Sequence, residues 1–181
     1  MSDATSRRAV ILYGPPASGK STITRCLEHI DGRYGLFPRL KAGGGRAAEY
    51  RIVTREYIEG LRIAGDIVWA NERYGAMYAI DRSYLLNLVE AGRIPVLHLG
   101  QRCAVDAVRS AIPDVRVTTI SLTYPRSLAV QRIADRATGD DADRIAAFDT
   151  TDRLVNADLV IDTSAVTPIE AAQLISGRIL T

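Results

Sequence analysis

The sequence predicts an α/β protein whose parallel core sheet is covered by helices on both faces. The first observation is the segment Gly-Pro-Pro-Ala-Ser-Gly-Lys-Ser at residues 14–21, which joins an apolar run at residues 9–13 to a helical pattern at residues 22–30. The second is that apolar runs and amphipathic stretches alternate along most of the chain, as they do when helices connect parallel strands. A length of 181 residues suits a single domain of this class.

Four short apolar runs are expected to form core strands, because a strand buried on both faces of a parallel sheet is apolar throughout. These runs cover residues 9–13, 95–99, 115–122 and 157–161. Helices are expected at residues 22–30, 83–90, 105–112, 125–137 and about 167–175. The last helix begins with Thr167 and Pro168 and has Glu170 in its first turn, a pattern typical of a capped N-terminus.

The segment between about residues 32 and 81 departs from this alternation. It contains three consecutive glycines at residues 43–45 and a short helical pattern at residues 55–63. Short β-like pieces are expected at residues 50–53, 67–70 and 76–80. The sequence therefore predicts one domain over residues 1–181, with a small, mostly antiparallel insert at about 32–81 and a core at residues 8–31 and 82–181.

Residues 14–21 match the pattern G-x-x-x-x-G-K-S, a loop that binds polyphosphates between a strand and a helix. Its glycines let backbone N–H groups turn toward a polyphosphate, and the helix N-terminus adds partial positive charge. Lys20 is expected to contact the β- and γ-phosphates, and the Ser21 hydroxyl to bind Mg²⁺. The predicted cofactors are ATP and Mg²⁺, and the predicted cofactor-binding residues are Gly14, Pro15, Ala17, Ser18, Gly19, Lys20, Ser21 and Thr22.

Composition limits the other functions that are expected. The net charge is only +2 and the longest basic run is the pair Arg7-Arg8, so no nucleic-acid partner is expected. No apolar run approaches the length of a membrane span, and neither a secretory leader nor a membrane partner is expected. Cys26 and Cys103 show no spacing typical of metal or redox chemistry. These features together predict a cytoplasmic location.

Lysine is rare in this chain. Of the 23 basic residues only Lys20 and Lys41 are lysines, and the others are arginines. Arginine can replace a lysine that is merely solvated, so a retained lysine points to a specific role. Lys41 lies next to the glycines at residues 43–45, where it either contacts a ligand or is a solvated loop residue.

Several segments of the insert follow a recognisable order: Arg-Leu-Lys-Ala-Gly at residues 39–43, Glu-Tyr-Arg-Ile-Val-Thr at 49–54, Glu-Tyr at 56–57, Val-Trp-Ala at 68–70 and Gly-Ala-Met-Tyr at 75–78. With the phosphate loop, this order resembles the guanylate kinase family of P-loop nucleoside monophosphate kinases over nearly the whole chain. The predicted fold is then a P-loop NTPase with a parallel five-stranded core sheet, helices on both faces, a small β-rich acceptor-binding insert and a short lid.

The resemblance implies that the insert holds a phosphorylated small-molecule acceptor, such as a nucleotide or a sugar phosphate. By position, Arg39 and Lys41 match the arginines of the family that hold the acceptor phosphate, and Tyr50 and Tyr78 match its phosphate-contacting tyrosines. Several cationic and hydroxyl donors are needed there, because two phosphates that approach each other repel unless they are screened. The alternative for the tyrosines is an ordinary role as half-buried strand residues, and Trp69 is expected in the core.

Three positions depart from the guanine-reading pattern of the family. Val68 stands where the family has a glutamate that reads guanine, Ile80 stands where it has a small hydroxyl residue, and the neighbouring glycine is Ala79. A pocket without those polar groups cannot select guanine by pairing its N–H groups. The sequence therefore predicts a pocket that does not read guanine.

The strand end at residues 99–102 also departs from the family. It reads Leu-Gly-Gln-Arg, where the family has D-I-D with carboxylates near the acceptor and the metal. Gly100 and Arg102 match a G-x-R turn of the ribose 1,5-bisphosphate kinases, which are similar in fold and lack the guanine-reading glutamate. Gln101 and Arg102 are accordingly expected to bind the acceptor.

A lid is expected at about residues 132–146, after the third core strand. Arg132 and Arg136 are four residues apart and share one helix face, so both are predicted to close over the transferring phosphoryl group as catalytic residues. Arg144 is a further candidate, and a solvated basic face is the alternative. Residues 162–164 occupy the position that contacts the donor base in the family.

No general base is evident in the sequence. An acceptor that is already an ionised phosphate needs none, whereas a hydroxyl acceptor would need a carboxylate, for which Asp81, Asp106 and Glu72 are the candidates. His29 and His98 are expected to be structural.

The leading hypothesis is an ATP-dependent phosphotransferase that acts on a phosphorylated acceptor. The alternatives are a true guanylate kinase, a ribose 1,5-bisphosphate kinase, and a non-catalytic binding module with the same fold.

Overall fold

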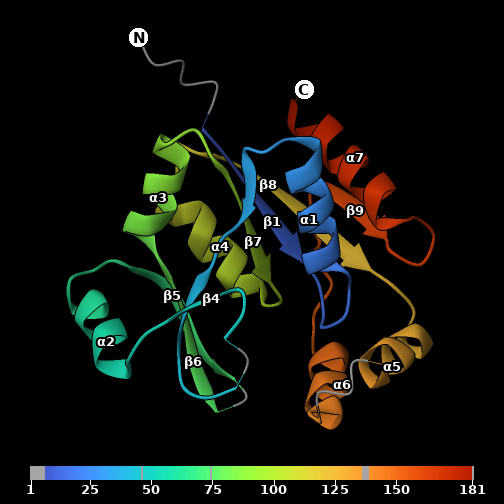
Figure 1. The fold of residues 1–181 in the computed structure, drawn as a ribbon, viewed down its shortest axis with the longest axis horizontal. Helices are drawn as coiled ribbons and strands as arrows, with labels where there is room; N and C mark the ends of the chain where they lie inside the picture. The colour runs from blue at the N-terminus through green and yellow to red at the C-terminus, as the bar shows by residue number, and fades with distance from the viewer. Residues whose placement is uncertain (1–6, 46, 74, 136–138, 181) are drawn as a thin grey trace.

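A parallel sheet of five strands forms the centre of the molecule, which we describe from a computed structural model for residues 7–45, 47–73, 75–135 and 139–180 (Figure 1). The strand order is β2-β7-β1-β8-β9, and all neighbouring pairs are parallel. The strands are β1 (Arg8–Tyr13), β2 (Tyr34–Leu36), β7 (Ile94–Leu99), β8 (Arg116–Thr123) and β9 (Leu159–Asp162). The five-stranded parallel sheet is thus confirmed.

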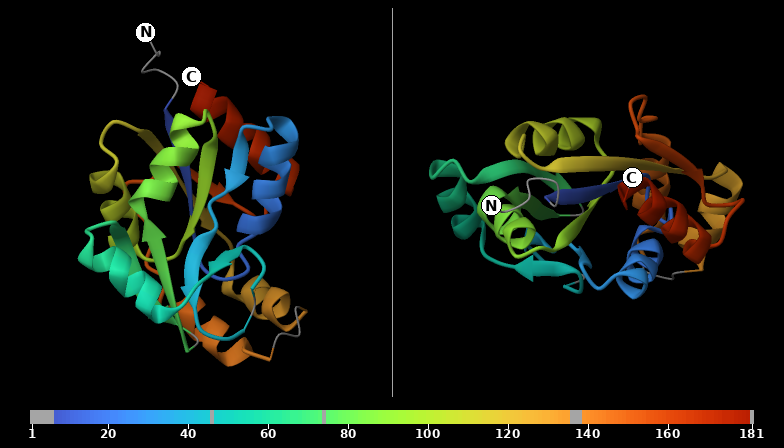
Figure 2. Two further views of the ribbon diagram at one scale, coloured as in Figure 1. Left: turned by 60° about the vertical axis from the view of Figure 1, so that its left-hand side comes forward. Right: turned by 90° about the horizontal axis from the view of Figure 1, so that it is seen from above.

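Helices cover both faces of this sheet (Figure 2). Side chains alternate along β1, so Val10 and Leu12 pack toward α1 (Lys20–Ile30) and α7 (Pro168–Leu180). Ile11 and Tyr13 point to the opposite face, toward α3 (Arg82–Glu90) and α4 (Arg102–Ala111). Because β1 is buried on both faces, it reads as a continuous apolar run, which is why its position was predictable.

The fifth core strand is β2, which lies in the segment that the sequence assigns to the insert. Tyr34 pairs with Ile94 of β7, and only Tyr34 of the three strand residues is buried. The strand therefore has no apolar run. The boundary of the insert is accordingly corrected: the insert's own sheet begins at β3 (Arg39–Ala42).

The insert forms a second sheet of four strands in the order β4-β3-β6-β5. Besides β3 it contains β4 (Tyr50–Ile52), β5 (Ile67–Arg73) and β6 (Ala76–Asp81), and α2 (Arg55–Ile63) packs on it. The pairs β3–β6 and β5–β6 are antiparallel, while β3–β4 is parallel. The mostly antiparallel, β-rich insert is therefore present.

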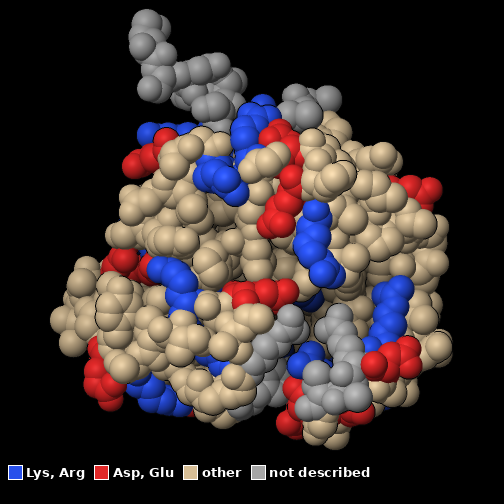
Figure 3. Space-filling view, in the orientation of Figure 1, with Lys and Arg blue, Asp and Glu red and all other residues tan. Residues whose placement is uncertain are grey.

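Two helices, α5 (Arg126–Ala134) and α6 (Asp141–Asp149), pack against each other at the carboxyl end of the core strands (Figure 1). They overlap the segment at about residues 132–146 where the sequence predicts a lid, and we call these two helices the lid; the sequence does not predict α6. Arg136 lies outside the described residues. On the face shown in Figure 3, many basic side chains of the described residues lie close to acidic ones.

An ion pair lies where the insert meets the core. Arg51 of β4 donates two hydrogen bonds to Asp81, which ends β6 directly before α3, and its Nε donates to Pro38 O at 3.0 Å. The guanidinium carbon lies 3.8 Å from the ring centroid of Tyr84 in α3. Asp81 is 5% exposed, and the Arg51 guanidinium that it pairs with also contacts Pro38 O and the Tyr84 ring of α3.

Replacing Asp81 with alanine should lower the free energy of unfolding by about 2–3 kcal/mol, because it leaves a half-buried guanidinium without its anion. Urea unfolding measures this loss. The matched control is Glu72→Ala, which removes the partner of Arg55 from a pair that is exposed on both sides and should change stability by less than ~0.5 kcal/mol. Equal losses in the two variants would show that the buried Arg51–Asp81 pair contributes no more to stability than an exposed pair.

Candidate active site

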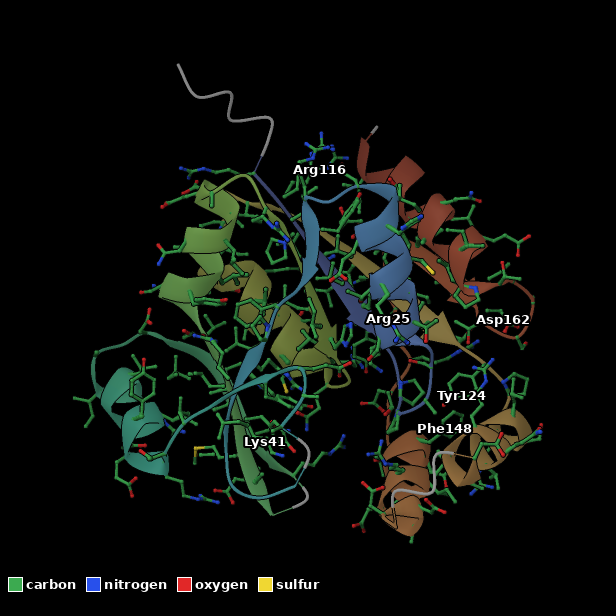
Figure 4. The ribbon with its side chains drawn as sticks, viewed as in Figure 1. Arg25, Lys41, Arg116, Tyr124, Phe148 and Asp162 are labelled. Carbon is green, nitrogen blue, oxygen red and sulfur yellow. The ribbon has the colours of Figure 1, made fainter. Side chains whose placement is uncertain are left out.

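A cavity of about 300 Å³ opens at the carboxyl end of the core sheet, where the phosphate loop, the insert and the lid meet. Ligand sites of open α/β sheets characteristically lie at this edge. Figure 4 shows Lys41 on the insert side and Tyr124 and Phe148 on the lid side. The predicted site residues that line the cavity are Gly14, Ala17, Ser18, Gly19, Lys20, Ser21, Arg39, Lys41, Tyr50, Tyr78 and Gln101.

The phosphate loop is shaped by close backbone contacts. The Gly14 N–H donates to Leu99 O at 3.0 Å, and a Cβ atom at residue 14 would lie 2.8 Å from Leu122 O. Only glycine therefore fits between the two strands that flank β1. Gly19 has φ of +89° and immediately precedes α1, so the loop turns through a left-handed residue into the helix N-terminus.

Lys20 is the first residue of α1, and its ammonium group bridges the loop. Nζ donates to Gly14 O at 2.7 Å, to Pro15 O at 2.8 Å and to Ser18 Oγ at 3.1 Å. These contacts fix the ammonium group at the N-terminus of α1, where the helix dipole and the lysine charge both favour binding of an anion. Ser21 lines the cavity one position further along the helix.

Four predicted acceptor residues form what we call the cation–aromatic cluster: Arg39, Lys41, Tyr50 and Tyr78. Strand register brings them together, because Arg39 pairs with Tyr50 and Lys41 pairs with Tyr78. The two rings are 5.3 Å apart at a 56° angle. The Arg39 guanidinium carbon lies 5.8 and 5.4 Å from the Tyr50 and Tyr78 centroids, and Lys41 Nζ lies 5.5 and 5.7 Å from them.

Lys41 is only 2% exposed, although it lines the cavity. The glycine-rich loop packs against it, and a Cβ atom at Gly45 would lie 3.5 Å from its Nζ. A lysine buried against aromatic rings is not a solvated loop residue, so that alternative is excluded by its burial. Its ammonium group instead lies against the Tyr50 and Tyr78 rings at the wall of the cavity.

Strand β5 supplies a polar wall that sequence reasoning missed. Trp69, Asn71 and Arg73 line the cavity at every second position. Asn71 Nδ2 donates to Gln101 Oε1 at 3.2 Å, and its buried Oδ1 has no hydrogen-bond partner among the described residues. The alternation after Trp69 could have revealed these residues, because every second side chain of a strand shares one face.

Val68 and Ile80 do not line the cavity. Both pack with the core cluster under α3 and α4, and Ile80 is fully buried. Trp69, expected only in the core, packs against that cluster and also lines the cavity. The apolar side chains at positions 68 and 80 therefore do not form the cavity wall, to which Trp69, Asn71 and Arg73 of β5 contribute.

Three further predicted residues lie outside the cavity lining. Pro15 contributes only its carbonyl, as the acceptor for Lys20, and Thr22 is exposed on α1. Arg102 is exposed at the first position of α4, so only Gln101 of that pair lines the cavity. The pattern at residues 99–102 does not predict the direction of each side chain.

Arg132 of the lid packs beside the phosphate loop instead of lining the cavity. Its Nη1 donates to Thr163 Oγ1 at 3.2 Å and its Nη2 to Thr163 O at 3.0 Å. The guanidinium carbon lies 5.0 Å from the ring centroid of Tyr124, whose hydroxyl donates to Pro16 O. Arg132 thus connects α5 to residues 162–164 and to the loop, while Phe148 of α6 packs edge-on against Tyr124 at 5.2 Å.

The carboxylates named as base candidates all lie away from the cavity. Asp81 is paired with Arg51, Glu72 is exposed with Arg55, and Asp106 is exposed on α4. Among the described residues, the acidic ones that line the cavity are Glu49 and Asp140. Asp140 accepts a hydrogen bond from Arg144 Nε at 2.6 Å, and Arg144 also lines the cavity.

His98, expected to be structural, lines the cavity near the end of β7. Its Nε2 lies 2.8 Å from Thr24 Oγ1, and that hydroxyl donates to Lys20 O at 2.9 Å. Burial, together with the positive charges of Lys20 and Arg39, holds the pKa of His98 well below its usual value. The imidazole is therefore neutral at pH 7.

Two curated guanylate kinases are similar to the chain in sequence. The enzyme from Trichormus variabilis is 25% identical over 115 residues, which are 61% of this chain and 57% of the relative. The enzyme from a Nostoc species is 27% identical over 114 residues, or 60% and 57% of the two chains. The chain thus spans less than two thirds of the length of these relatives, and no family model matches it.

Solved structures show the same fold. A guanylate kinase from Anaplasma phagocytophilum superposes with a TM-score of 0.60 at 18% identity, over 96% of this chain and 85% of that one. The adenylylsulfate (APS) kinase of Mycobacterium tuberculosis, solved with AMPPNP and APS, gives 0.59 at 14% identity over 97% and 99%.

The fold is shared with these P-loop kinases. In sequence the chain is similar to guanylate kinases, the family that its motifs resemble. Among the described residues, no helix is long and apolar enough to cross a membrane.

Proposed function

We propose that the chain is an ATP-dependent kinase that transfers the γ-phosphoryl group to a phosphorylated small molecule in the cytoplasm. The observation that carries this proposal is that the phosphate loop and the cation–aromatic cluster line one cavity. A donor held by Lys20 and an acceptor phosphate held by Arg39 and Lys41 would face each other across it. Such positioning and charge neutralisation account for most of the catalysis of phosphoryl transfer.

The residues present fit Mg²⁺ as the metal. Ser21 offers a hydroxyl at the N-terminus of α1 beside Lys20, and the cavity is lined mainly by polar groups. Mg²⁺ prefers oxygen ligands, keeps several of its waters and is completed by substrate phosphates, so one protein hydroxyl is a sufficient first ligand. When bound, the metal would neutralise charge that develops on the β- and γ-phosphates.

The acceptor site supports a polar acceptor that need not be GMP. Asn71, Gln101 and Arg73 offer amide and guanidinium groups where the acceptor's non-phosphate part would lie. Neither Val68 nor Ile80 reaches this space, so guanine selection by those positions is not supported. The similarity to guanylate kinases favours GMP as the second candidate acceptor, and ribose 1,5-bisphosphate is the third.

A coupled assay of ADP release tests the proposal, with GMP, other nucleoside monophosphates and ribose 1,5-bisphosphate as separate acceptors. Turnover that depends on one of these acceptors and on Mg²⁺ is expected. Preferential turnover of GMP would contradict a pocket that does not read guanine. Equilibrium binding of AMPPNP with Mg²⁺ distinguishes a kinase from a non-catalytic module, because the module would bind no nucleotide.

A further inference from the structure

The ring of His98 has a defined tautomer. Thr24 has one hydroxyl proton, which it donates to Lys20 O, so Thr24 Oγ1 must accept its hydrogen bond from Nε2–H of His98. A neutral imidazole with a proton on Nε2 carries a lone pair on Nδ1. Nδ1 makes no hydrogen bond to another of the described residues.

The position of His98 relative to the phosphate loop follows from the helix. Thr24 lies three residues after Ser21 and four after Lys20, so the three side chains belong to neighbouring positions on one side of α1. His98 contacts Thr24 and lines the same cavity as Lys20 and Ser21. Its strand, β7, pairs directly with β1, which leads into the loop.

Three basic side chains that line the cavity, Lys20, Arg39 and Lys41, can only donate hydrogen bonds. The carboxylates in the lining, Glu49 and Asp140, come from the insert loop and the lid, and neither belongs to the phosphate loop or to β7. A hydrated Mg²⁺ presents donors, because its bound waters point their hydrogens outward, and P-loop enzymes commonly place a carboxylate near the metal. Strand β7 carries no carboxylate, and His98 is the residue of this strand whose side chain offers an acceptor nitrogen to the cavity.

We propose that His98 is a positioning residue for Mg²⁺, whose Nδ1 accepts a hydrogen bond from a water bound to the metal beside Ser21. Its Nε2–H is held by Thr24, which fixes the ring in the tautomer that this role requires. The proposal rests on the proposed function, because it needs the phosphate loop to bind ATP with Mg²⁺.

Two substitutions distinguish the role of Nδ1 from that of Nε2. His98→Gln can place an amide donor near the position of Nε2 and keep Thr24 as partner, but it has no acceptor at the position of Nδ1. His98→Asn can place an amide oxygen near Nδ1 and loses the bond to Thr24. His29→Gln, on the exposed end of α1, is the matched control.

The dissociation constant of ATP is measured by calorimetry with Mg²⁺ and with EDTA for each variant, without acceptor. Mg²⁺ should strengthen ATP binding by the wild-type chain. In His98→Gln we expect this strengthening to be about tenfold smaller and ATP binding in EDTA to be nearly unchanged, because loss of an outer-shell partner typically weakens metal binding by about this factor. His98→Asn should retain the strengthening within about threefold, and His29→Gln should retain it fully.

If Mg²⁺ strengthens ATP binding by His98→Gln as much as by the wild type, the proposal is overturned. Equal weakening of ATP binding with Mg²⁺ and with EDTA would also overturn it, because that result indicates a purely structural role. Absence of ATP binding by the wild-type chain in both conditions would instead contradict the proposed function. Nitrogen NMR of the wild-type imidazole keeps the test independent of folding of the variants. We expect the proton on Nε2, and a shift of Nδ1 with Mg²⁺ and ATP but not with ATP in EDTA; a proton on Nδ1 would overturn the proposal.

Discussion

Replacing Lys20 with alanine is expected to lower the rate of phosphoryl transfer at least ~100-fold. The ammonium group lies at the N-terminus of α1, where the donor's β- and γ-phosphates would bind, and it is held there by Gly14 O, Pro15 O and Ser18 Oγ. Removal of a preorganised charge-stabilising contact typically costs about 3 kcal/mol of transition-state stabilisation, which is a factor of about 100 in rate. Steady-state turnover with saturating ATP and acceptor measures the loss.

Arg25→Ala is the matched control for Lys20→Ala, because Arg25 is exposed on the same helix and lies outside the cavity lining (Figure 4). It removes the same charge and should retain turnover within about twofold, since exposed charges are screened. Thermal unfolding of both variants establishes that they are folded. A Lys20→Ala enzyme that keeps more than about a tenth of wild-type turnover would show that the loop does not neutralise the donor's charge.

Local patterns were sufficient for the parts of the fold that local interactions determine. The helix predicted at residues 55–63 coincides with α2, because Thr54 caps it by accepting from Tyr57 N at 3.1 Å. The predicted cap of α7 is present, since Glu170 accepts from the N–H of Thr167 at 2.8 Å. The phosphate loop was predictable for the same reason: strand, glycines and helix follow one another in the chain.

The missed elements depend on partners that are distant in the chain. Strand β2 exists because β7 pairs with it, and its own residues include only one that is buried. In β3, Arg39 and Lys41 alternate with Leu40 and Ala42, so that the apolar residues pack under α2 while the cations face the aromatic rings. Arg39 and Lys41 were predicted to hold the acceptor phosphate, but no strand was predicted at residues 39–42.

In the candidate site, too, the features that depend on local sequence were predictable and those that depend on distant partners were not. Positions within the loop followed from spacing, whereas the polar wall of β5 did not, because Asn71 faces Gln101 only once the insert packs on the core. Helix α6 was missed for a similar reason. Ala147 is its only described buried residue, so packing on α5 and Tyr124 stabilises it more than its own pattern does.

Lys41→Ala should raise the Michaelis constant for the acceptor at least ~10-fold and leave that for ATP within about twofold, because a hydrogen bond to a charged group is worth about 1.5–3 kcal/mol. The lysine is 2% exposed beside Tyr50 and Tyr78, so its charge acts in the part of the cavity where we propose that the acceptor phosphate binds. The measurement is the pair of Michaelis constants, taken once the assay of ADP release has identified the acceptor.

Lys41→Arg is the companion variant, because it keeps the charge and changes only its shape. The same two rings already accommodate the guanidinium of Arg39 at 5.8 and 5.4 Å, whereas Gly45 lies close to the present ammonium. We therefore expect arginine to keep the acceptor's Michaelis constant within about threefold of wild type. Equal increases for ATP and acceptor in the alanine variant would indicate general damage to the insert. No increase for either substrate would mean that the buried lysine stabilises the insert and does not hold the acceptor phosphate.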